Sequence, residues 1–526
     1  MATVSRRDVL KMGVLGGAVL ALPLERTVHA QSASSGRLAA SRLPKPFNVP
    51  FAIPPVLPPV RTDGTTDFYR VEMRPAQVEI IPGFQTQIWG YNGTYPGPTV
   101  HSAVGRKTVM RQINHLPATD PVLNFTPWTS VHLHGMPSKP QFDGYASDIT
   151  NPGQYKDYQY PNSTTARTLW YHDHGVHHTT ETVGMGLAAQ YHLYDQLEQS
   201  LPIPHGAFDV PLIVADMMFK PDGSILFDDH NESGVFGDVI LVNGKPWPAM
   251  QVKQRKYRFR MLNASITRSY NLLLDSGDQF TFIGTDGGLM PQPVKTASFR
   301  FAPAERYEVV IDFANIAVGR LVVLGNRSPD NNIDFANTDK VMAFDVVAGA
   351  FDPTNNAVPD VLNPANTTMA LQPAPGMKTR LFEFVRKGGL WTINGHTWQD
   401  VIDSKFTLVE ARPISGDVEI WEFRNDSGGW HHPVHVHLVD FKILSRNGRP
   451  PFPYEVGPKD VVYLGEGETV RVVARFDEGV GKYMMHCHNL VHEDHDMMTQ
   501  FEVGGAGEDD PLGDRAKNLP VPEPPL

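Results

Sequence analysis

Four His-x-His pairs are the residues of this 526-residue chain whose type and spacing could do chemistry. On a β-strand, residues i and i+2 point to the same face about 7 Å apart, so each pair presents two imidazoles together. Imidazole is a common ligand of zinc, copper, iron and nickel. The pairs are His132 and His134, His172 and His174, His435 and His437, and His486 and His488. We expect the eight rings to converge on a small group of metal ions.

Cys487, the only cysteine of the chain, lies between His486 and His488. Because neighbouring strand residues point to opposite faces, its thiol must face away from the site of the two imidazoles. Cys487 therefore belongs to a second metal site, which the backbone joins to the first. This connection gives an electron a short covalent route from the second site to the histidine cluster.

The second site has the donor set of a blue copper. Two histidines, one cysteine and a weak axial methionine form that set, whereas zinc would attract more thiolates. Met498 competes as the axial ligand, but the spacing from Cys487 favours Met497. The predicted ligands are His432, Cys487, His492 and Met497.

The elements that must position these residues are β-strands. Short segments alternate apolar and polar residues between Gly, Pro, Asn and Asp turns, as in KYRFRMLN at 256–263 and TVRVVARF at 469–476. The chain has 45 glycines, 45 prolines and few long amphipathic helical patterns. This composition predicts all-β sandwiches or barrels.

An internal repeat divides the chain into three copies of one β-domain. Asn-Gly turns begin at Asn92, Asn243 and Asn394, and consecutive turns are 151 residues apart. Each turn is followed by a strand that ends in an asparagine, which a repeated domain explains most simply. These asparagines are Asn114, Asn263 and Asn425. Two histidine pairs lie in the first copy and two in the third, so we expect the site to lie between these two copies.

We predict six segments along the chain. They are a signal peptide at 1–30, a first domain at 31–200, a second domain without copper at 201–352, a linker at 353–376, a third domain at 377–505 and a tail at 506–526. The first and third domains each hold half of the histidine cluster, and the third also holds the blue copper. We expect the acidic, Pro-rich tail to be loosely ordered.

The N-terminus has the pattern of a twin-arginine export signal. SRRDVLK at 5–11 precedes an apolar run at 12–22 that is too short to cross a membrane, and Val28-His29-Ala30 offers a cleavage site. We expect the Tat machinery to export the chain to the periplasm or the medium as a monomer, without stable membrane insertion. Cleavage after Ala30 would change the formal charge from -11 to -13, and an acidic chain without a basic run argues against nucleic-acid binding.

These motifs, in this order and over nearly the whole mature chain, resemble the multicopper oxidases. Within that family, VHLHG at 131–135, TLWYHDH at 168–174, HPVHVHLVDFKILSR at 432–446 and HCHNLVHEDHDMM at 486–498 most resemble bilirubin oxidases and bacterial laccases. The resemblance implies three cupredoxin-like Greek-key β-sandwich domains. It also implies four copper ions, one of type 1 in the third domain and a trinuclear cluster of one type 2 and two type 3 ions between the first and third.

The resemblance also assigns roles residue by residue. His432, Cys487, His492 and Met497 would hold the type 1 copper, and His132 and His435 the type 2 copper. The type 3 ligands would be His134, His172, His174, His437, His486 and His488. Asp143 and Glu493 match two carboxylates that deliver protons to bound oxygen in this family, a role that suits a reaction consuming four protons.

Matching the copies with one another, and the same resemblance, single out three further residues. Asp173 occupies the place of Cys487 in the first copy, and Thr129 occupies the place of His432, so the first domain should hold no blue copper. Trp430 lies two residues before His432 and matches a tryptophan beside the blue copper of bilirubin oxidases. It could shape electron transfer from the reductant, together with His492, or serve only in packing.

Two functions remain open. The first is an oxidase that takes single electrons from phenols, aromatic amines or bilirubin-like pigments near His492 and reduces O₂ to water. The alternative is a periplasmic cuprous oxidase or a copper-handling or resistance protein. A cuprous oxidase would be expected to carry a methionine-rich segment, but the 18 methionines here are scattered, with pairs only at 217–218, 484–485 and 497–498.

Overall fold

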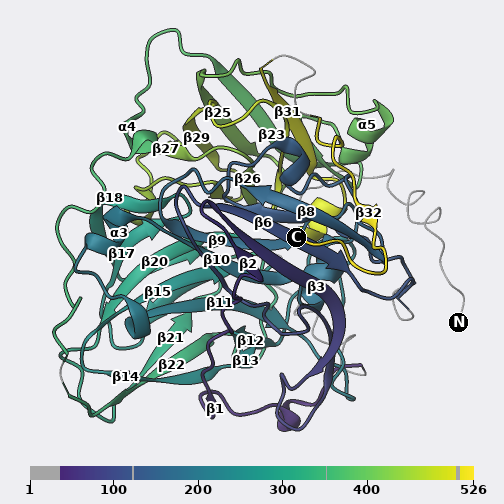
Figure 1. The fold of residues 1–526 in the computed structure, drawn as a ribbon. Helices are drawn as coiled ribbons and strands as arrows, with labels where there is room; N and C mark the ends of the chain where they lie inside the picture. Colours follow the sequence, from purple (N-terminus) through teal and green to yellow (C-terminus); the bar gives the residue numbers. More distant parts are fainter. Residues whose placement is uncertain (1–35, 121–123, 351, 505–509) are drawn as a thin grey trace, which may run out of the picture. The chain divides into compact units, whose positions relative to one another are not determined.

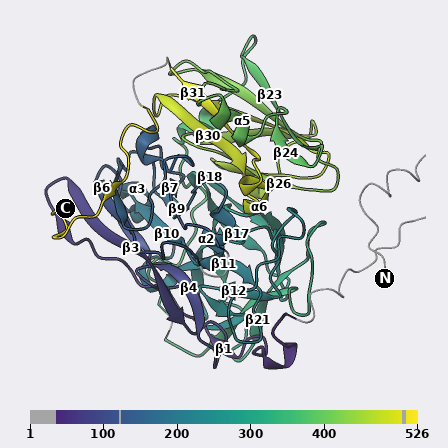
Figure 2. The same ribbon diagram turned by 90° about the vertical axis from the view of Figure 1, so that its right-hand side faces the viewer.

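The computed structural model of the protein describes residues 36–120, 124–350, 352–504 and 510–526. The predicted signal peptide and its cleavage site lie outside these residues. All elements below belong to one unit, Leu38–Leu526. Its strands form six sheets in the described residues, two for each predicted copy. Figures 1 and 2 show the third copy, coloured green to yellow, at one end of this unit.

The first copy is a pair of sheets from the N-terminal third of the chain. One sheet has the order β2 (Arg61–Thr62), β3 (Thr66–Val78), β6 (Lys107–Asn114), β8 (Gln154–Tyr160) and β32 (Lys517–Asn518), with β4 (Thr86–Tyr91) paired to β3. The other has the order β5 (Val100–Ala103), β10 (Ala188–Tyr194), β9 (Arg167–Asp173) and β7 (Val131–His134). The second sheet, with the residue that follows β9, carries the four histidines of the two predicted His-x-His pairs of this copy.

The middle copy has a seven-stranded and a six-stranded sheet. One has the order β13 (Lys245–Pro246), β12 (Val239–Val242), β11 (Asp209–Met217), β15 (Lys256–Asn263), β20 (Arg306–Asp312), β17 (Phe280–Thr285) and β18 (Gly288–Thr296). The other has the order β1 (Val49–Pro50), β14 (Pro248–Lys253), β22 (Lys340–Val347), β21 (Leu321–Asn326), β16 (Tyr270–Leu274) and β19 (Ser298–Phe301). The early strand β1 thus pairs with the middle copy.

The third copy repeats the arrangement of the first. One sheet has the order β24 (Leu390–Ile393), β23 (Thr379–Lys387), β25 (Val418–Asn425), β29 (Thr469–Arg475) and β27 (Phe441–Arg446). The other has the order β28 (Val461–Leu464), β26 (His432–Val436), β30 (Gly481–Cys487) and β31 (Met498–Val503). All of the predicted copper ligands of this copy lie on the second sheet or on the short segments that follow its strands.

The helices are short and lie between strands. The α-helices are α2 (Thr179–Met185), α3 (Gln196–Ser200), α4 (Thr367–Ala370), α5 (Trp398–Asp403) and α6 (Leu490–Asp494). The 3₁₀ helices are η1 (Ala40–Arg42), η2 (Pro140–Phe142), η3 (Gly206–Phe208) and η4 (Pro453–Glu455). None of the helices in the described residues is long and apolar enough to cross a membrane.

The repeat is visible in the turns and in one buried asparagine per copy. The three Asn-Gly turns place both of their residues at positive φ, between 50° and 83°, a conformation that Asn and Gly adopt most readily. At the end of β6, β15 and β25, the side-chain oxygen of a buried asparagine accepts from the backbone N–H two residues later, and its amide donates to backbone carbonyls. The prediction of an all-β chain with three copies of one sandwich is confirmed.

The strand order around these asparagines is also the same in each copy. The strand that ends in the asparagine pairs in parallel with an earlier strand, as β6 with β3, β15 with β11 and β25 with β23. On its other side it pairs antiparallel with a later strand, as β6 with β8, β15 with β20 and β25 with β29. One cluster of buried apolar residues fills the first and middle copies, and a separate cluster, which includes Cys487, fills the third.

The tail differs from its prediction where the structure describes it. Residues Lys517–Asn518 form β32, which pairs antiparallel with β8 of the first copy. The Glu523 carboxylate accepts hydrogen bonds from Arg70 and from the buried Arg111. Backbone pairing and two charge-assisted bonds hold the segment on the first copy, so the expectation of a loosely ordered tail is wrong for residues 510–526.

Candidate metal centre

Two strand pairs, one in each outer copy, position the eight predicted cluster histidines. In the first copy β7 and β9 are antiparallel, and His132 lies opposite His172. In the third copy β26 and β30 are antiparallel, and His435 lies opposite His486. The second histidine of each His-x-His pair lies on the same face as the first because the side-chain period of a strand is two. The sequence thus places four rings on each of two sheets.

The two sheets bring their rings together across the boundary between the copies. The Nε2 atoms of His132 and His435 lie 3.4 Å apart. Those of His174 and His486 lie 3.0 Å apart, and those of His437 and His486 lie 3.2 Å apart. The donor atoms fall into groups whose members lie within 4.8 Å of one another. These groups are His132, His134 and His435, then His134, His172 and His488, then His174, His437 and His486.

Backbone carbonyls fix the orientation of four of these rings. The Nδ1 atoms of His132, His172 and His435 lie 2.5, 2.7 and 2.9 Å from the carbonyl oxygens of Asp143, Asp173 and Asp460, and His486 Nδ1 lies 3.2 Å from the carbonyl oxygen of Cys487. A carbonyl can only accept, so each Nδ1 carries the proton and each Nε2 offers its lone pair to the centre of the cluster. Such outer hydrogen bonds are the usual support of metal-ligating histidines.

His134 is oriented the other way. Its Nε2 lies 3.1 Å from a carboxylate oxygen of Asp460, and its Nδ1 has no hydrogen-bond partner in the described residues. His134 therefore donates through Nε2 and presents Nδ1 to the cluster.

The cluster fits copper. All eight rings are buried, and burial lowers their pKa values, so the imidazoles are neutral and able to ligate. Among the described residues, His172 Nε2 and both ring nitrogens of His488 lack a hydrogen-bond partner despite burial. Unpaired buried nitrogens are costly unless another group binds them, and imidazole nitrogen is a good copper ligand.

Two buried carboxyl groups lie against the outer edge of the cluster, one from each outer copy. Asp143 Oδ2 lies 2.8 Å from His437 Nδ1, and Glu493 Oε2 lies 2.9 Å from His486 Nδ1. Burial raises the pKa of Asp143 well above its usual value and raises the pKa of Glu493 to about 7. Both groups can therefore hold a proton near neutral pH.

The thiol of Cys487 lies among the predicted type 1 ligands. Its Sγ is 3.3 Å from His432 Nδ1 and 3.7 Å from His492 Nδ1, and the two Nδ1 atoms are 3.2 Å apart. All three side chains are fully buried. Burial raises the pKa of the Cys487 thiol, so a thiolate there requires a cation beside it.

Backbone hydrogen bonds tie Met497 to this group. The N–H of Met497 donates to the carbonyl of His492 at 2.9 Å, and the N–H of Cys487 donates to the carbonyl of Met497 at 3.1 Å. The Met497 side chain packs in the same buried cluster as Cys487, whereas Met498 packs in another, with Tyr145 and Met484. This packing agrees with the choice of Met497 over Met498.

The side of His492 that faces away from Cys487 is covered. Its Nε2–H donates to the carbonyl of Ser233, which lies in a loop of the middle copy, at 3.1 Å. The indole of Trp391 stacks on the His492 ring with centroids 3.7 Å apart, and Trp430 meets it edge-on at 5.6 Å. The Trp391 Nε1–H donates to the carbonyl of Glu232 in the same loop.

The sequence does not single out Trp391, Ser233 or Asp460. Trp391 precedes an Asn-Gly turn and looks like an ordinary strand residue, while Ser233 acts only through its backbone. Asp460 lies in the dipeptide Lys459-Asp460, 23 residues after His437, with no histidine spacing to mark it. A charged pair directly before the apolar strand β28 is the available signal for Asp460.

Comparison with known proteins identifies relatives over most of the chain. Multicopper oxidase family models match residues 72–197, 209–344 and 354–506. The chain is 42% identical to a bilirubin oxidase of Albifimbria verrucaria over 455 residues, which cover 83% of this chain and 76% of that protein. It is 34% identical to a laccase of Bacillus subtilis (strain 168) over 472 residues, which cover 80% of this chain and 90% of that protein.

A solved structure shows the same fold. The laccase of Pediococcus acidilactici superposes with a TM-score of 0.77 at 28% identity, covering 88% of this chain and 95% of that chain. The three family matches together span most of the sequence, and the two relatives are covered over three quarters or more of their own length. The chain therefore belongs to the multicopper oxidase family of copper-binding oxidoreductases.

Proposed function

We propose that this protein takes single electrons from phenolic, aromatic-amine or bilirubin-like reductants near His492 and uses them to reduce O₂ to water. The observation that carries the proposal is the junction at Cys487. Its thiol faces His432 and His492, while the flanking His486 and His488 belong to the other donor groups. The identity to a bilirubin oxidase and to laccases supports the choice of reductants.

We assign four copper ions to the donor groups. His432, Cys487, His492 and Met497 would hold the type 1 ion, and His132 and His435 the type 2 ion. The type 3 ligands would be His134, His172, His174, His437, His486 and His488. When bound, copper would supply one-electron redox chemistry at both places, accepting electrons at the first and binding and reducing O₂ at the second.

The chain's own contribution near the cluster is to hold protons. Reduction of one O₂ to two waters takes up four electrons and four protons. Asp143 and Glu493 are buried carboxyl groups with raised pKa values, each beside a ring nitrogen of the cluster. A group that retains its proton near neutral pH and lies inside the site can donate it and be reprotonated, so we propose both as proton donors.

At the other site, the chain determines how a reductant approaches. His492 is buried, and its outer nitrogen binds the Ser233 carbonyl, so a reductant meets the loop around Ser233, Trp391 and Trp430 before it meets the ligand. Trp391 is itself fully buried, whereas Trp430 is half-buried. We therefore place Trp430, with His492 behind it, at the point where electrons are taken up. An outer-sphere approach of this kind accommodates several classes of aromatic reductant.

Cu(I) oxidation or copper handling is the second candidate, and the structure gives it less support. The methionines of the three adjacent pairs, at 217–218, 484–485 and 497–498, are all buried. A surface that collects Cu(I) needs accessible thioethers, because soft sulfur ligands are what Cu(I) prefers.

We also propose that the chain acts outside the cytoplasm as a monomer after export through the Tat pathway. The support for export is the arginine pair and cleavage pattern in residues 5–30, which lie outside the described residues. Detection of the mature N-terminus at Gln31 in the periplasm, and its loss when Arg6 and Arg7 are replaced by lysine, would test this part.

Oxygen consumption by the copper-loaded protein tests the function. Bilirubin, a methoxyphenol and Cu(I) are supplied in parallel, with Cys487→Ser as the control. We expect turnover with the organic reductants, and neither turnover nor blue absorption in Cys487→Ser. Turnover with Cu(I) alone would contradict the proposal, and a blue Cys487→Ser variant would contradict the type 1 assignment.

A further inference from the structure

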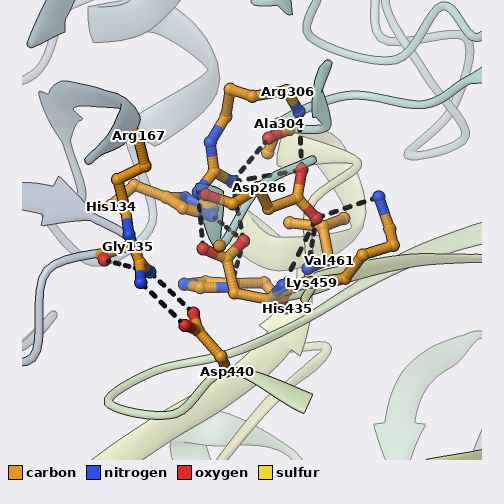
Figure 3. A network of polar contacts seen from close by, with 12 residues as sticks. His134, Gly135, Arg167, Asp286, Ala304, Arg306, His435, Asp440, Lys459 and Val461 are labelled. Carbon is orange, nitrogen blue, oxygen red and sulfur yellow. Dashed lines mark hydrogen bonds and ion pairs between the residues drawn. The ribbon is translucent and has the colours of Figure 1, made fainter. Parts of the chain in front are cut away.

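The middle copy has no histidine pair, yet one of its arginines extends into the boundary where the cluster lies. Arg306, the first residue of β20, is fully buried and extends toward His134 and His435 (Figure 3). A buried arginine requires acceptors for five N–H groups. The acceptors of these N–H groups therefore identify the residues that Arg306 positions.

All five N–H groups of Arg306 are bound. Nε donates to the carbonyl of Thr168 at 3.1 Å, and the two terminal nitrogens donate to the carbonyls of Ala304 at 3.1 Å and Asp286 at 3.3 Å. The remaining two N–H groups donate to the two carboxylate oxygens of Asp460 at 2.6 and 2.5 Å. Thr168 belongs to the first copy and Asp460 to the third, so this single guanidinium joins all three copies.

Asp460, which Arg306 holds in place, binds two histidines of the cluster. Its Oδ1 accepts from His134 Nε2 at 3.1 Å, and its backbone carbonyl accepts from His435 Nδ1 at 2.9 Å. The first bond fixes His134 in the orientation that presents Nδ1, unlike the four rings whose Nδ1 donates to a backbone carbonyl. The second bond makes His435 present Nε2. One residue thus sets the tautomers of two rings that we assign to different copper types.

The neighbours of Asp460 hold it from the other side. Asp286 of the middle copy accepts from the backbone N–H of Asp460 and Val461 at 3.3 and 3.2 Å, and it lies 3.0 Å from Lys459 Nζ. Gly135, which follows His134, is tightly enclosed, since a Cβ there would lie 2.6 Å from Arg306 Nη2. The arrangement leaves no room for Arg306 or Asp460 to shift without moving His134.

We infer that Arg306 is a positioning residue for the copper cluster, through which the middle copy, which has no His-x-His pair, sets the orientation of His134 and His435. The inference rests on the proposed function, because it concerns the copper that these histidines would bind. Lysine cannot replace arginine here, since a single ammonium offers three donors without the planar fork that fits a carboxylate. Loss of an outer partner of this kind typically costs about 10- to 100-fold in metal affinity or activity.

The test compares Arg306→Lys with wild type and with Arg260→Lys. Arg260 is a matched control because it is equally buried and joins the first and middle copies, through Glu198, Asp209 and Glu308, without a hydrogen bond to any of the eight histidines in the described residues. Each protein is loaded with copper. The copper content per chain, the electron paramagnetic resonance spectrum of type 2 copper, the blue absorption, and kcat and KM for a methoxyphenol are then measured.

We expect Arg306→Lys to keep the blue absorption and the KM for the reductant, because His432, Cys487 and His492 are untouched. Its kcat should fall about 10- to 100-fold, with an altered type 2 spectrum or a lower copper content. Arg260→Lys should leave the spectrum and the copper content as in wild type. Wild-type spectra and copper content in Arg306→Lys, or an equal loss in Arg260→Lys, would overturn the inference.

A second variant covers the case in which Arg306→Lys does not fold. Asp460→Asn keeps the size of the side chain but removes the charge that Arg306 grips, so it should alter the same type 2 signal, and an unchanged signal would overturn the inference. The wild-type chain separates the two proposals. If it shows no type 2 signal, the proposed function is wrong and the inference falls with it; if it shows the signal and both variants keep it, only the inference falls.

Discussion

The first and third copies place different residues at one position of the same strand pair. In β30, Cys487 lies between two cluster histidines and faces His432 and His492. In β9, Asp173 lies between His172 and His174, and it is equally buried. Its carboxylate accepts from the backbone N–H of Ser130 and Gly175 at 2.7 and 3.2 Å, and from the Thr182 hydroxyl at 2.6 Å.

The residues around Asp173 do not form the donor set of a blue copper. Thr129, in the place of His432, pairs through its backbone with Thr150, and His178, five residues after Asp173, stacks on Phe125 with ring centroids 4.0 Å apart. The inward faces of both strand pairs meet at the boundary between the two copies, and both carry histidines there. On each outward face the central donor groups come from one copy, and in the first copy a carboxylate that binds local donors stands where the third copy has its thiol.

The largest expected effect comes from replacing Cys487 of the third copy with aspartate, the residue that the first copy has at this position. Cys487→Asp should abolish the blue absorption and reduce oxygen consumption to background, because aspartate does not supply the thiolate of a blue copper. The eight cluster histidines face the other way, so the type 2 resonance signal should persist. Met498→Leu, a change in a separate buried cluster, serves as the control and should stay blue. Blue absorption in Cys487→Asp would refute the outward-face assignment.

A second test removes the two buried carboxyl groups, one from each outer copy, that lie beside the histidine cluster. Asp143→Asn and Glu493→Gln should each lower kcat by roughly 10²- to 10⁴-fold, the usual contribution of a positioned proton donor, with the blue absorption retained. Asp403→Asn, at an exposed carboxylate of the third copy, should have no effect on kcat. If turnover in both cluster variants matched wild type in steady-state oxygen consumption, neither carboxyl would be a proton donor.

The third test concerns stability on the outward face of the first copy. Asp173→Ala leaves the N–H groups of Ser130 and Gly175 without their acceptor, while the Thr182 hydroxyl keeps the carbonyls of His178 and Thr179 as acceptors. We expect the free energy of unfolding to fall by about 3 kcal/mol, since each buried unsatisfied donor costs about 1 to 3 kcal/mol and some will reach water. Denaturant unfolding of the copper-free chain measures this change. A drop below about 0.5 kcal/mol would show that the carboxylate does not hold this strand end.

The smallest expected effect lies at Trp430 in the third copy, the proposed point of electron uptake. Trp430→Phe should change kcat/KM for a methoxyphenol by about 2- to 10-fold, the range of a single aromatic contact, and leave the blue absorption intact. Phe125→Leu, at a ring that stacks on His178 of the first copy, is the control and should leave kcat/KM unchanged. Equal effects of the two substitutions would show that Trp430 serves only in packing.

Strand alternation and the 151-residue repeat make much of the site predictable from the sequence. A strand has a rigid two-residue period, so Cys487 and its neighbours can be assigned to opposite faces from the order of the residues. The repeat indicates in a similar way that the first and third copies share a site. Both inferences use regularities of the chain that depend little on contacts between distant segments.

The parts that could not be predicted depend on contacts between distant segments. The reversed orientation of His134 depends on Asp460, which the chain brings from 326 residues away. The cover of His492 is a backbone carbonyl at Ser233, and no side-chain pattern encodes it. The composition of the tail at 510–526 is typical of a loosely ordered segment, and a sequence does not show that β8 has an open edge.

The loop that carries Glu232 and Ser233 has a consequence for which reductants can be used. Its two carbonyls accept from the outward N–H groups of Trp391 and His492. Neither of these N–H groups is therefore free to donate to an incoming molecule. Under the proposed function, electrons cross a closed surface here, and a reductant need only touch that surface. Molecular size then ceases to select among reductants: a phenolic polymer and its monomer should differ in diffusion and in oxidation potential, not in fit.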